Sequence, residues 1–158
     1  MLHIAILAAA VAAQPVLPGE QPIELPYTVS DANAGATPYG DPGLLAAFHG
    51  QDGLRRIADD LVARLDADPR ISDIFKGHDH VRLRRTLYEQ FCYILGGGCA
   101  YTGRDMTAAH KDLGLQHADM NALVENLQAA MRKERVPFAA QNRLLAKLAP
   151  MRPQVIER

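Results

Sequence analysis

The sequence has no tryptophan, only two cysteines and no excess of basic residues, with 17 Lys and Arg against 18 Asp and Glu. Without a basic excess the chain lacks the electrostatic signature of nucleic-acid binding, so we expect no nucleic acid among its partners. Two cysteines without a second pair fit no zinc motif. The apolar run at residues 2–13 is too short to span a bilayer, and we expect no transmembrane segment in the mature domain.

Lysine and arginine are also absent from the start of the chain, where the first basic residue is Arg55. The apolar run nevertheless ends in small residues before Gln14 and Pro15, which favours a signal peptide over residues 1–13, cleaved near Ala13. The missing positive start supports the alternative of a disordered amino-terminal extension. We expect a periplasmic or secreted protein if the leader is cleaved, and a cytoplasmic one otherwise.

Residues 14–43 contain six prolines between Pro15 and Pro42. Proline this dense blocks both helices and sheet ladders, and few side chains here look able to fill a core. The composition predicts a proline-rich flexible arm.

Residues 44–158 carry a helical pattern. Apolar residues recur every three or four positions in four stretches, which predicts helices over 54–65, 83–94, 120–131 and 144–148. Strand-like alternation is absent. A chain of 158 residues with 48% hydrophobic residues has enough apolar material for one core, so we expect a single all-α domain.

The most unusual stretch, residues 95–115, reads LGGGCAYTGRDMTAAHKDLGL. Met106, His110 and Leu113 share one helical face, because they stand at i, i+4 and i+7. Two interpretations follow. A histidine on an apolar face is often a packed core residue. It can equally be the axial ligand of a haem iron whose porphyrin the apolar neighbours enclose.

The run GGG-x2-YTG-x2-M-x3-H-x2-LGL, preceded by a helix ending in Phe91, resembles group I truncated haemoglobins. The resemblance extends over roughly residues 44–149. It implies a truncated globin fold, a two-over-two helical sandwich in which two antiparallel helix pairs cross. It also implies haem b as cofactor, His110 as the iron ligand and reversible binding of O2, NO or CO.

The resemblance further implies which side chains enclose the haem. We expect the second ring nitrogen of His110 to donate to a backbone carbonyl, which would orient the ring. Lys111 and Arg82 are candidates for pairing with the propionates. Core packing alone would produce the same apolar stripes. The expected haem contacts are Phe75 flat on the porphyrin, Leu83, Leu87 and Phe91 on the distal side, and Met106, Leu115, Met120 and Leu123 on the proximal side.

The sequence departs from the family on the distal side. Val62 stands where typical members carry a tyrosine that donates to bound O2, and Leu87 stands where glutamine is frequent. Losing one hydrogen bond to a charged acceptor should speed O2 release by roughly ten- to a hundredfold. The loop residues His78 and His80 are candidates for an internal sixth iron ligand.

Cys92 and Cys99 lie seven residues apart across the glycine-rich loop. An exported chain would favour a disulfide between them, and two buried thiols are the alternative.

The leading function is therefore gas binding by a haem protein, with O2 transport or storage as one use. An enzymatic alternative is NO dioxygenation, for which the sequence offers no flavin or nicotinamide module, so an external reductase would be needed. The third alternative is a cofactor-free helical interaction domain.

Overall fold

The computed structural model of the protein describes residue 14 and residues 16–156; the predicted leader lies outside them. The described residues contain helices, turns and loops, with no strand among them, which confirms the all-α prediction. The elements in chain order are η1 (Asp31–Ala34), α1 (Pro42–Ala47), α2 (Gly50–Ala67), α3 (Ser72–Phe75), α4 (His80–Ile94), α5 (Met106–His110), α6 (His117–Lys133), α7 (Phe138–Leu148), η2 (Ala149–Met151) and α8 (Arg152–Val155).

The long helices bury the stripes that predicted them. On α2, Leu54, Ile57, Leu61 and Leu65 are all 1% exposed or less. The starts of two helices differ from the sequence prediction. Helix α4 already begins at His80, which the sequence placed in a loop. Helix α6 begins at His117, before the predicted start at 120, and the carboxylate of its third residue, Asp119, accepts from the Gln116 backbone in a capping box.

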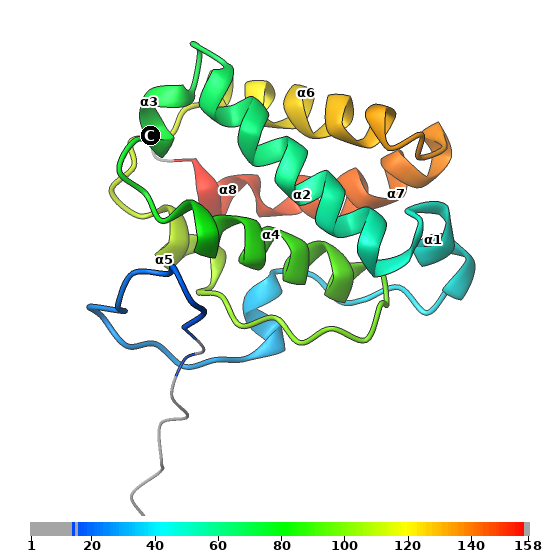
Figure 1. Ribbon diagram of the computed structural model, residues 1–158, viewed down its shortest axis with the longest axis horizontal. Coiled ribbons are helices and arrows are strands. Elements are labelled where there is room, and N and C mark those ends of the chain that lie inside the picture. Colours follow the sequence, from blue (N-terminus) through cyan, green and yellow to red (C-terminus); the bar gives the residue numbers. More distant parts are fainter. Residues whose placement is uncertain (1–13, 15, 157–158) are drawn as a thin grey trace, which may run out of the picture.

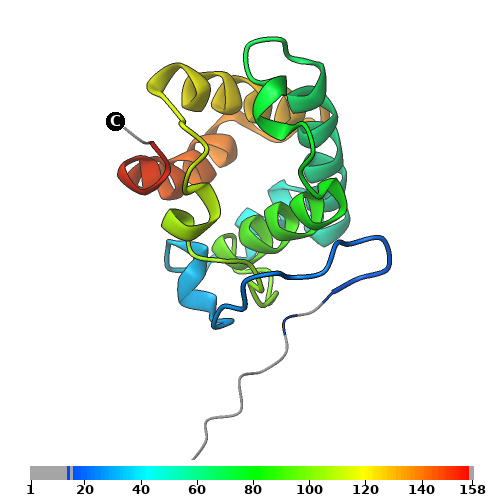
Figure 2. The same cartoon turned by 90° about the vertical axis from the view of Figure 1, so that its left-hand side faces the viewer.

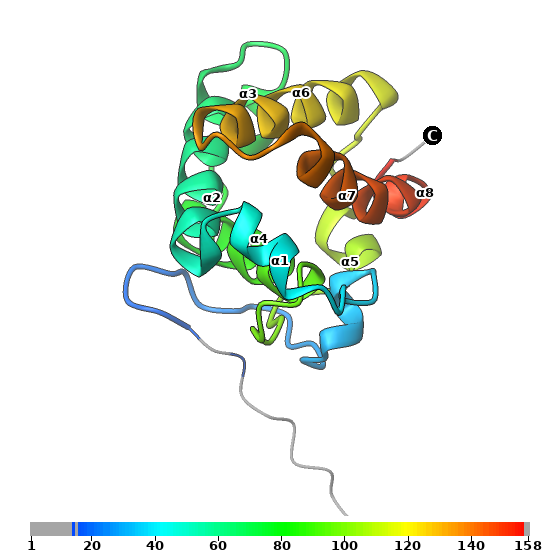
Figure 3. The same cartoon turned by 90° about the vertical axis from the view of Figure 1, so that its right-hand side faces the viewer.

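Two layers of helices make up the fold (Figure 1). Helix α2 packs against α4 and α6, and α4 also packs against α7. Seen from the right-hand side of Figure 1, α2 and α4 lie on one side of the molecule, α7 and α8 lie on the other and α6 crosses the top, while α5 packs near α8 (Figure 3). This is the crossed arrangement of helix pairs expected for a truncated globin. No helix of the described residues is long and apolar enough to cross a membrane.

The segment before α1 is not a free arm. Residues 16–43 lie along the lower edge of the helices in Figure 1, and Ala34 is fully buried in the hydrophobic core. The Gln90 amide donates to the Ala34 carbonyl at 2.9 Å, and the Tyr39 amide donates to the Ile94 carbonyl at 2.8 Å. Composition misled here because hydrogen bonds of backbone and polar groups attach much of this segment, and such bonds leave no apolar pattern in the sequence. Proline also restricts the unfolded chain, which lowers the entropy lost on ordering.

The glycine-rich loop after α4 packs closely on this segment. Gly96 has a φ of 75°, and a Cβ there would collide with the Tyr39 carbonyl oxygen. Both facts require glycine at this position. The loop then returns along α4 toward Tyr101, whose backbone amide donates to Asp31 at 2.8 Å.

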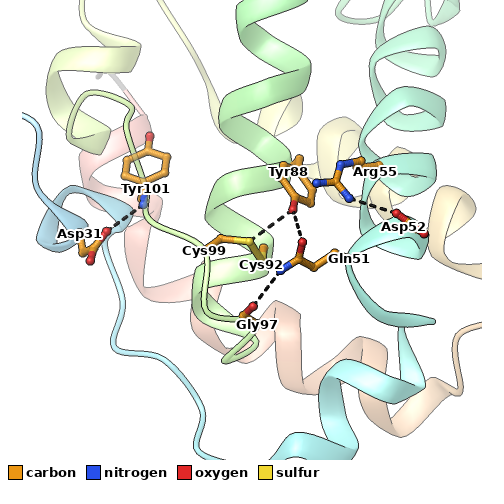
Figure 4. The surroundings of a disulfide bond; sticks show 9 residues. All are labelled: Asp31, Gln51, Asp52, Arg55, Tyr88, Cys92, Gly97, Cys99 and Tyr101. Carbon is orange, nitrogen blue, oxygen red and sulfur yellow. Dashed lines mark hydrogen bonds and ion pairs between the residues drawn. A yellow bond between two sulfur atoms is a disulfide. The ribbon is translucent and has the colours of Figure 1, made fainter. Parts of the chain in front are cut away.

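Cys92 and Cys99 form a disulfide that joins α4 to this returning loop (Figure 4). Their Cα atoms are 5.7 Å apart, and neither cysteine is free. The Tyr88 hydroxyl lies 3.3 Å from the Cys99 sulfur and donates to Gln51 at 3.0 Å. Of the two alternatives that the sequence left open, the structure therefore has the disulfide. It fixes the loop that leads into the cavity described next.

Candidate functional site

A cavity of about 460 Å³ lies between α4 on one side and α5, α6 and α8 on the other. Figure 2 looks along this part of the molecule, with α8 and α5 opposite α4. Eight of the nine residues predicted to contact haem line the cavity; they are Phe75, Leu83, Leu87, Phe91, Met106, His110, Met120 and Leu123. The ninth, Leu115, follows the turn after α5; it is buried but is not among the lining residues.

His110 ends the short helix α5. Asp105 starts that helix, its carboxylate accepting from the Ala108 amide at 2.9 Å. The His110 Nδ1 lies 2.7 Å from the Met106 carbonyl oxygen, which can only accept, so Nδ1 carries the proton. Nε2 of the neutral ring then has the lone pair that a metal needs. Burial lowers the pKa of His110, although the hydrogen bond to Met106 acts in the opposite direction. The lowered pKa keeps the ring neutral.

Half of the α4 residues that line the cavity are apolar, namely Leu83, Leu87 and Phe91, and the uncharged polar side chains among the others are occupied. The Thr86 hydroxyl donates to the Arg82 carbonyl at 3.0 Å, and the Gln90 amide donates to Ala34. The α2 residue in the wall is Leu61, whereas Val62 is fully buried but outside the lining. Either residue is apolar, so the expected lack of a distal donor does not depend on which of them faces the cavity.

The two loop histidines differ. His80 is committed elsewhere, with Nε2 at 2.9 Å from the Phe75 carbonyl oxygen and Nδ1 at 3.3 Å from the Asp66 carboxylate. His78 lines the cavity. Of the two, only His78 therefore remains a candidate for an internal ligand.

The structure also distinguishes Arg82 from Lys111, the two predicted propionate partners, by their position relative to the cavity. Arg82 lines the cavity, and its Nε is the one buried side-chain nitrogen or oxygen without a hydrogen-bond partner among the described residues. Lys111 is 73% exposed and lies outside the lining. Arg82 fits the carboxylate of a haem propionate and Lys111 does not.

Sequence reasoning missed several wall residues. Gln21, Ile23 and Tyr27 line the cavity although they precede the helical domain, and Arg104 and Met151 do so from the loop before α5 and from η2. No periodic signal marks them, because they lie in coil or at the end of an element. Only the tertiary structure brings them to the cavity.

The residues present fit a haem. Ligand sites in proteins have volumes of about 300–1,000 Å³ and mostly apolar walls, and this cavity meets both conditions. It supplies one oriented neutral imidazole and one guanidinium whose Nε is buried, as an axial iron ligand and a propionate partner require.

Sequence comparison places the chain among known proteins. Residues 44–157 match the sequence profile of bacterial-like globins. The chain belongs to the bacterial-like globin family. It is 27% identical over 106 residues to a group 1 truncated haemoglobin of Mycolicibacterium paratuberculosis, a match that covers 67% of this chain and 78% of that protein. A group 1 truncated haemoglobin of Tetrahymena pyriformis is 34% identical over 76 residues, which cover 48% of this chain and 63% of that one.

Solved structures show the same fold. The truncated haemoglobin of Tetrahymena pyriformis in its Fe(III) form superposes with a TM-score of 0.69 at 24% identity, covering 73% of this chain and 98% of that one. The cyanomet 2/2 haemoglobin of Synechococcus, with covalently attached haem, gives a TM-score of 0.67 at 23% identity, with coverages of 73% and 98%. These structures show that the globin has the truncated-haemoglobin fold.

Proposed function

We propose that this globin binds a diatomic gas reversibly at the iron of a haem b held by His110. The observation that supports this proposal most directly is the hydrogen bond from His110 Nδ1 to the Met106 carbonyl at 2.7 Å. This bond fixes the ring at the cavity wall and leaves Nε2 as its basic nitrogen. The haem supplies an iron with one further coordination position for the gas. Thioether attachment of a c-type haem needs free cysteines, and both cysteines here are in a disulfide, which supports haem b.

The remaining wall residues bind and shield the haem. Phe75, Leu83, Leu87 and Phe91 would cover the gas side and exclude water, while Met106, Met120 and Leu123 would pack on the His110 side. Arg82 would hold a propionate through its guanidinium.

The gas side favours CO and NO over O2. Bound O2 gains from a hydrogen-bond donor, and Thr86 and Gln90 already donate to backbone carbonyls. CO and NO depend less on such a donor, so their retention suffers less. Of the predicted uses, O2 transport is accordingly the one this wall supports least.

The test is an absorption spectrum of the purified protein in the ferric, ferrous and CO forms. Wild-type protein should show a Soret band that shifts on reduction and on CO addition, and His110→Ala should weaken or shift that band. His117→Ala is a matched control, because His117 is an exposed histidine that contacts Arg152 instead of the cavity. Equal spectra for both variants would rule out His110 as the ligand.

We also propose that the protein works in an oxidising compartment, the periplasm or the exterior. The Cys92–Cys99 disulfide supports this, because such bonds persist mainly outside the reducing cytosol. Cell fractionation with sequencing of the mature amino terminus tests the proposal. Recovery of the protein only from the cytoplasm, beginning at Met1, would refute it.

A further inference from the structure

Residues 16–29, called here the N-terminal strap, run beside the cavity. In Figures 1, 2 and 3 this dark blue segment lies along α4. Gln21, Ile23 and Tyr27 from the strap line the cavity together with Arg82 and Arg104. The strap lies before residue 44, where the match to the globin family begins. It therefore lies outside the part of the chain that matches the family.

A buried ion pair fastens the strap to α4. The Glu20 side chain has no exposed surface, and its carboxylate accepts from Arg85 Nε at 2.5 Å and from Arg85 Nη2 at 3.1 Å. A second arginine, Arg82, has its Nε 3.6 Å from the same carboxylate. Burial raises the pKa of Glu20, but the Arg85 hydrogen bond and the charges of Arg85 and Arg82 lower it by more. The pKa therefore lies below its ordinary value, and the carboxylate stays ionised at neutral pH.

Hydrogen bonds extend the attachment in both directions along the strap. The Gln21 amide donates to the Asp79 carboxylate at 2.7 Å, and the Gln21 carbonyl accepts from Arg82. Farther along, Arg104 donates to the Leu25 carbonyl at 2.9 Å, and the Tyr27 hydroxyl donates to the Thr102 carbonyl at 2.9 Å. The strap thus bridges the start of α4 and the loop before α5, which are the two sides of the cavity.

Arg85 and Arg82 interact with Glu20 in different ways. Arg85 also pairs with Glu89 at 3.1 Å, so two carboxylates share it. Arg82 lines the cavity, and its buried Nε has no hydrogen bond. Glu20 therefore binds Arg85 through two hydrogen bonds and faces Arg82 only as a longer ion pair.

We propose that the N-terminal strap is an additional wall of the haem site, and that Glu20 is the positioning residue that latches it to Arg85 and Arg82 and so slows haem loss. This inference rests on the proposed function. If the strap is a wall, removing the Glu20 charge should let the strap detach and open that side of the cavity to water.

The first experiment measures haem transfer from the full-length ferric protein to excess apomyoglobin. Glu20→Gln should lose haem about tenfold faster or more, because it breaks a charge-assisted pair. Glu24→Gln is the matched control, since Glu24 is an exposed strap carboxylate, and it should transfer haem at the wild-type rate. An unchanged rate for Glu20→Gln would overturn the proposal. A slower rate would also overturn it, because Glu20 would then compete with a propionate for the arginines.

The second experiment follows amide hydrogen exchange of residues 16–29 with and without haem. In wild-type protein, haem loading should increase the protection of the strap, and Glu20→Gln should remove protection with or without haem. Equal strap exchange with and without haem would contradict the proposal that the strap is a wall of the haem site.

If wild-type protein takes up no haem, the proposed function fails instead, and hydrogen exchange of the cofactor-free variant still reports on the attachment of the strap by Glu20. Should Glu20→Gln not fold, Ile23→Ser removes a wall contact without touching the ion pair and should also hasten haem transfer; a wild-type rate for it would overturn the wall.

Discussion

The two sides of the cavity differ in what hydrogen bonds to backbone carbonyls do to their polar side chains. On the α5 side, a hydrogen bond to a carbonyl fixes the His110 ring and leaves one basic nitrogen for chemistry. On the α4 side, hydrogen bonds to carbonyls occupy the hydroxyl of Thr86 and the amide of Gln90, and apolar side chains form most of the remaining surface. The same kind of bond thus leaves one basic nitrogen on the α5 side and occupies the uncharged donors of the α4 side. The contrast predicts that the cavity holds an iron firmly and O2 weakly.

Stability provides the largest test of this contrast, because α4 also belongs to the core. Phe91 is 1% exposed and contacts both core and cavity, whereas Met120 on α6 is only half-buried. We expect Phe91→Ala to lower the free energy of unfolding by about 3–5 kcal/mol, and Met120→Ala by about 1 kcal/mol. Urea unfolding of both haem-free variants measures the difference. Equal losses would show that the two sides contribute alike to the core.

A donor placed on the α4 side should change O2 release next most strongly. Leu87→Gln introduces an amide at the cavity wall, and we expect O2 dissociation to slow by roughly ten- to a hundredfold, while CO dissociation changes much less. Leu87→Met is the control, since it keeps the volume without adding a donor. Stopped-flow displacement of O2 by CO gives the rates. Wild-type protein that already releases O2 slowly would show that a donor reaches the gas in the native site.

A substitution of Thr86 should have the smallest effect on O2 dissociation, and it tests directly whether the Thr86 hydroxyl is available to the bound gas. Its hydroxyl donates to the Arg82 carbonyl at 3.0 Å and approaches the Leu83 carbonyl at 3.3 Å. Thr86→Val should therefore alter O2 dissociation by less than about twofold, because the lost bond is internal to α4. Thr86→Ser, which keeps the hydroxyl, serves as the control. A tenfold acceleration in the valine variant alone would mean that Thr86 turns toward the gas, and the contrast between the two sides would be wrong.

The helical lining of the cavity could largely be predicted from the sequence, and the haem contacts themselves stay a prediction. Eight of nine expected haem contacts line the cavity, and the hydrogen bond expected at the second His110 nitrogen is present. These residues lie on helices, where a local repeat of three or four positions reports which face is buried. The exception, Leu115, follows Gly114 beyond the end of α5, where that repeat no longer applies.

The sequence by itself determined the all-α architecture, the family and the histidine, because helix periodicity and a dense local motif carry that information. Only the tertiary structure decided that Leu61 and not Val62 faces the cavity, that Cys92 and Cys99 are joined, and that a proline-rich segment packs as a strap. These outcomes depend on pairs such as Glu20 and Arg85, 65 residues apart. A coil segment has no repeat to announce its partner, so its position follows from which distant carbonyls and charges it can satisfy.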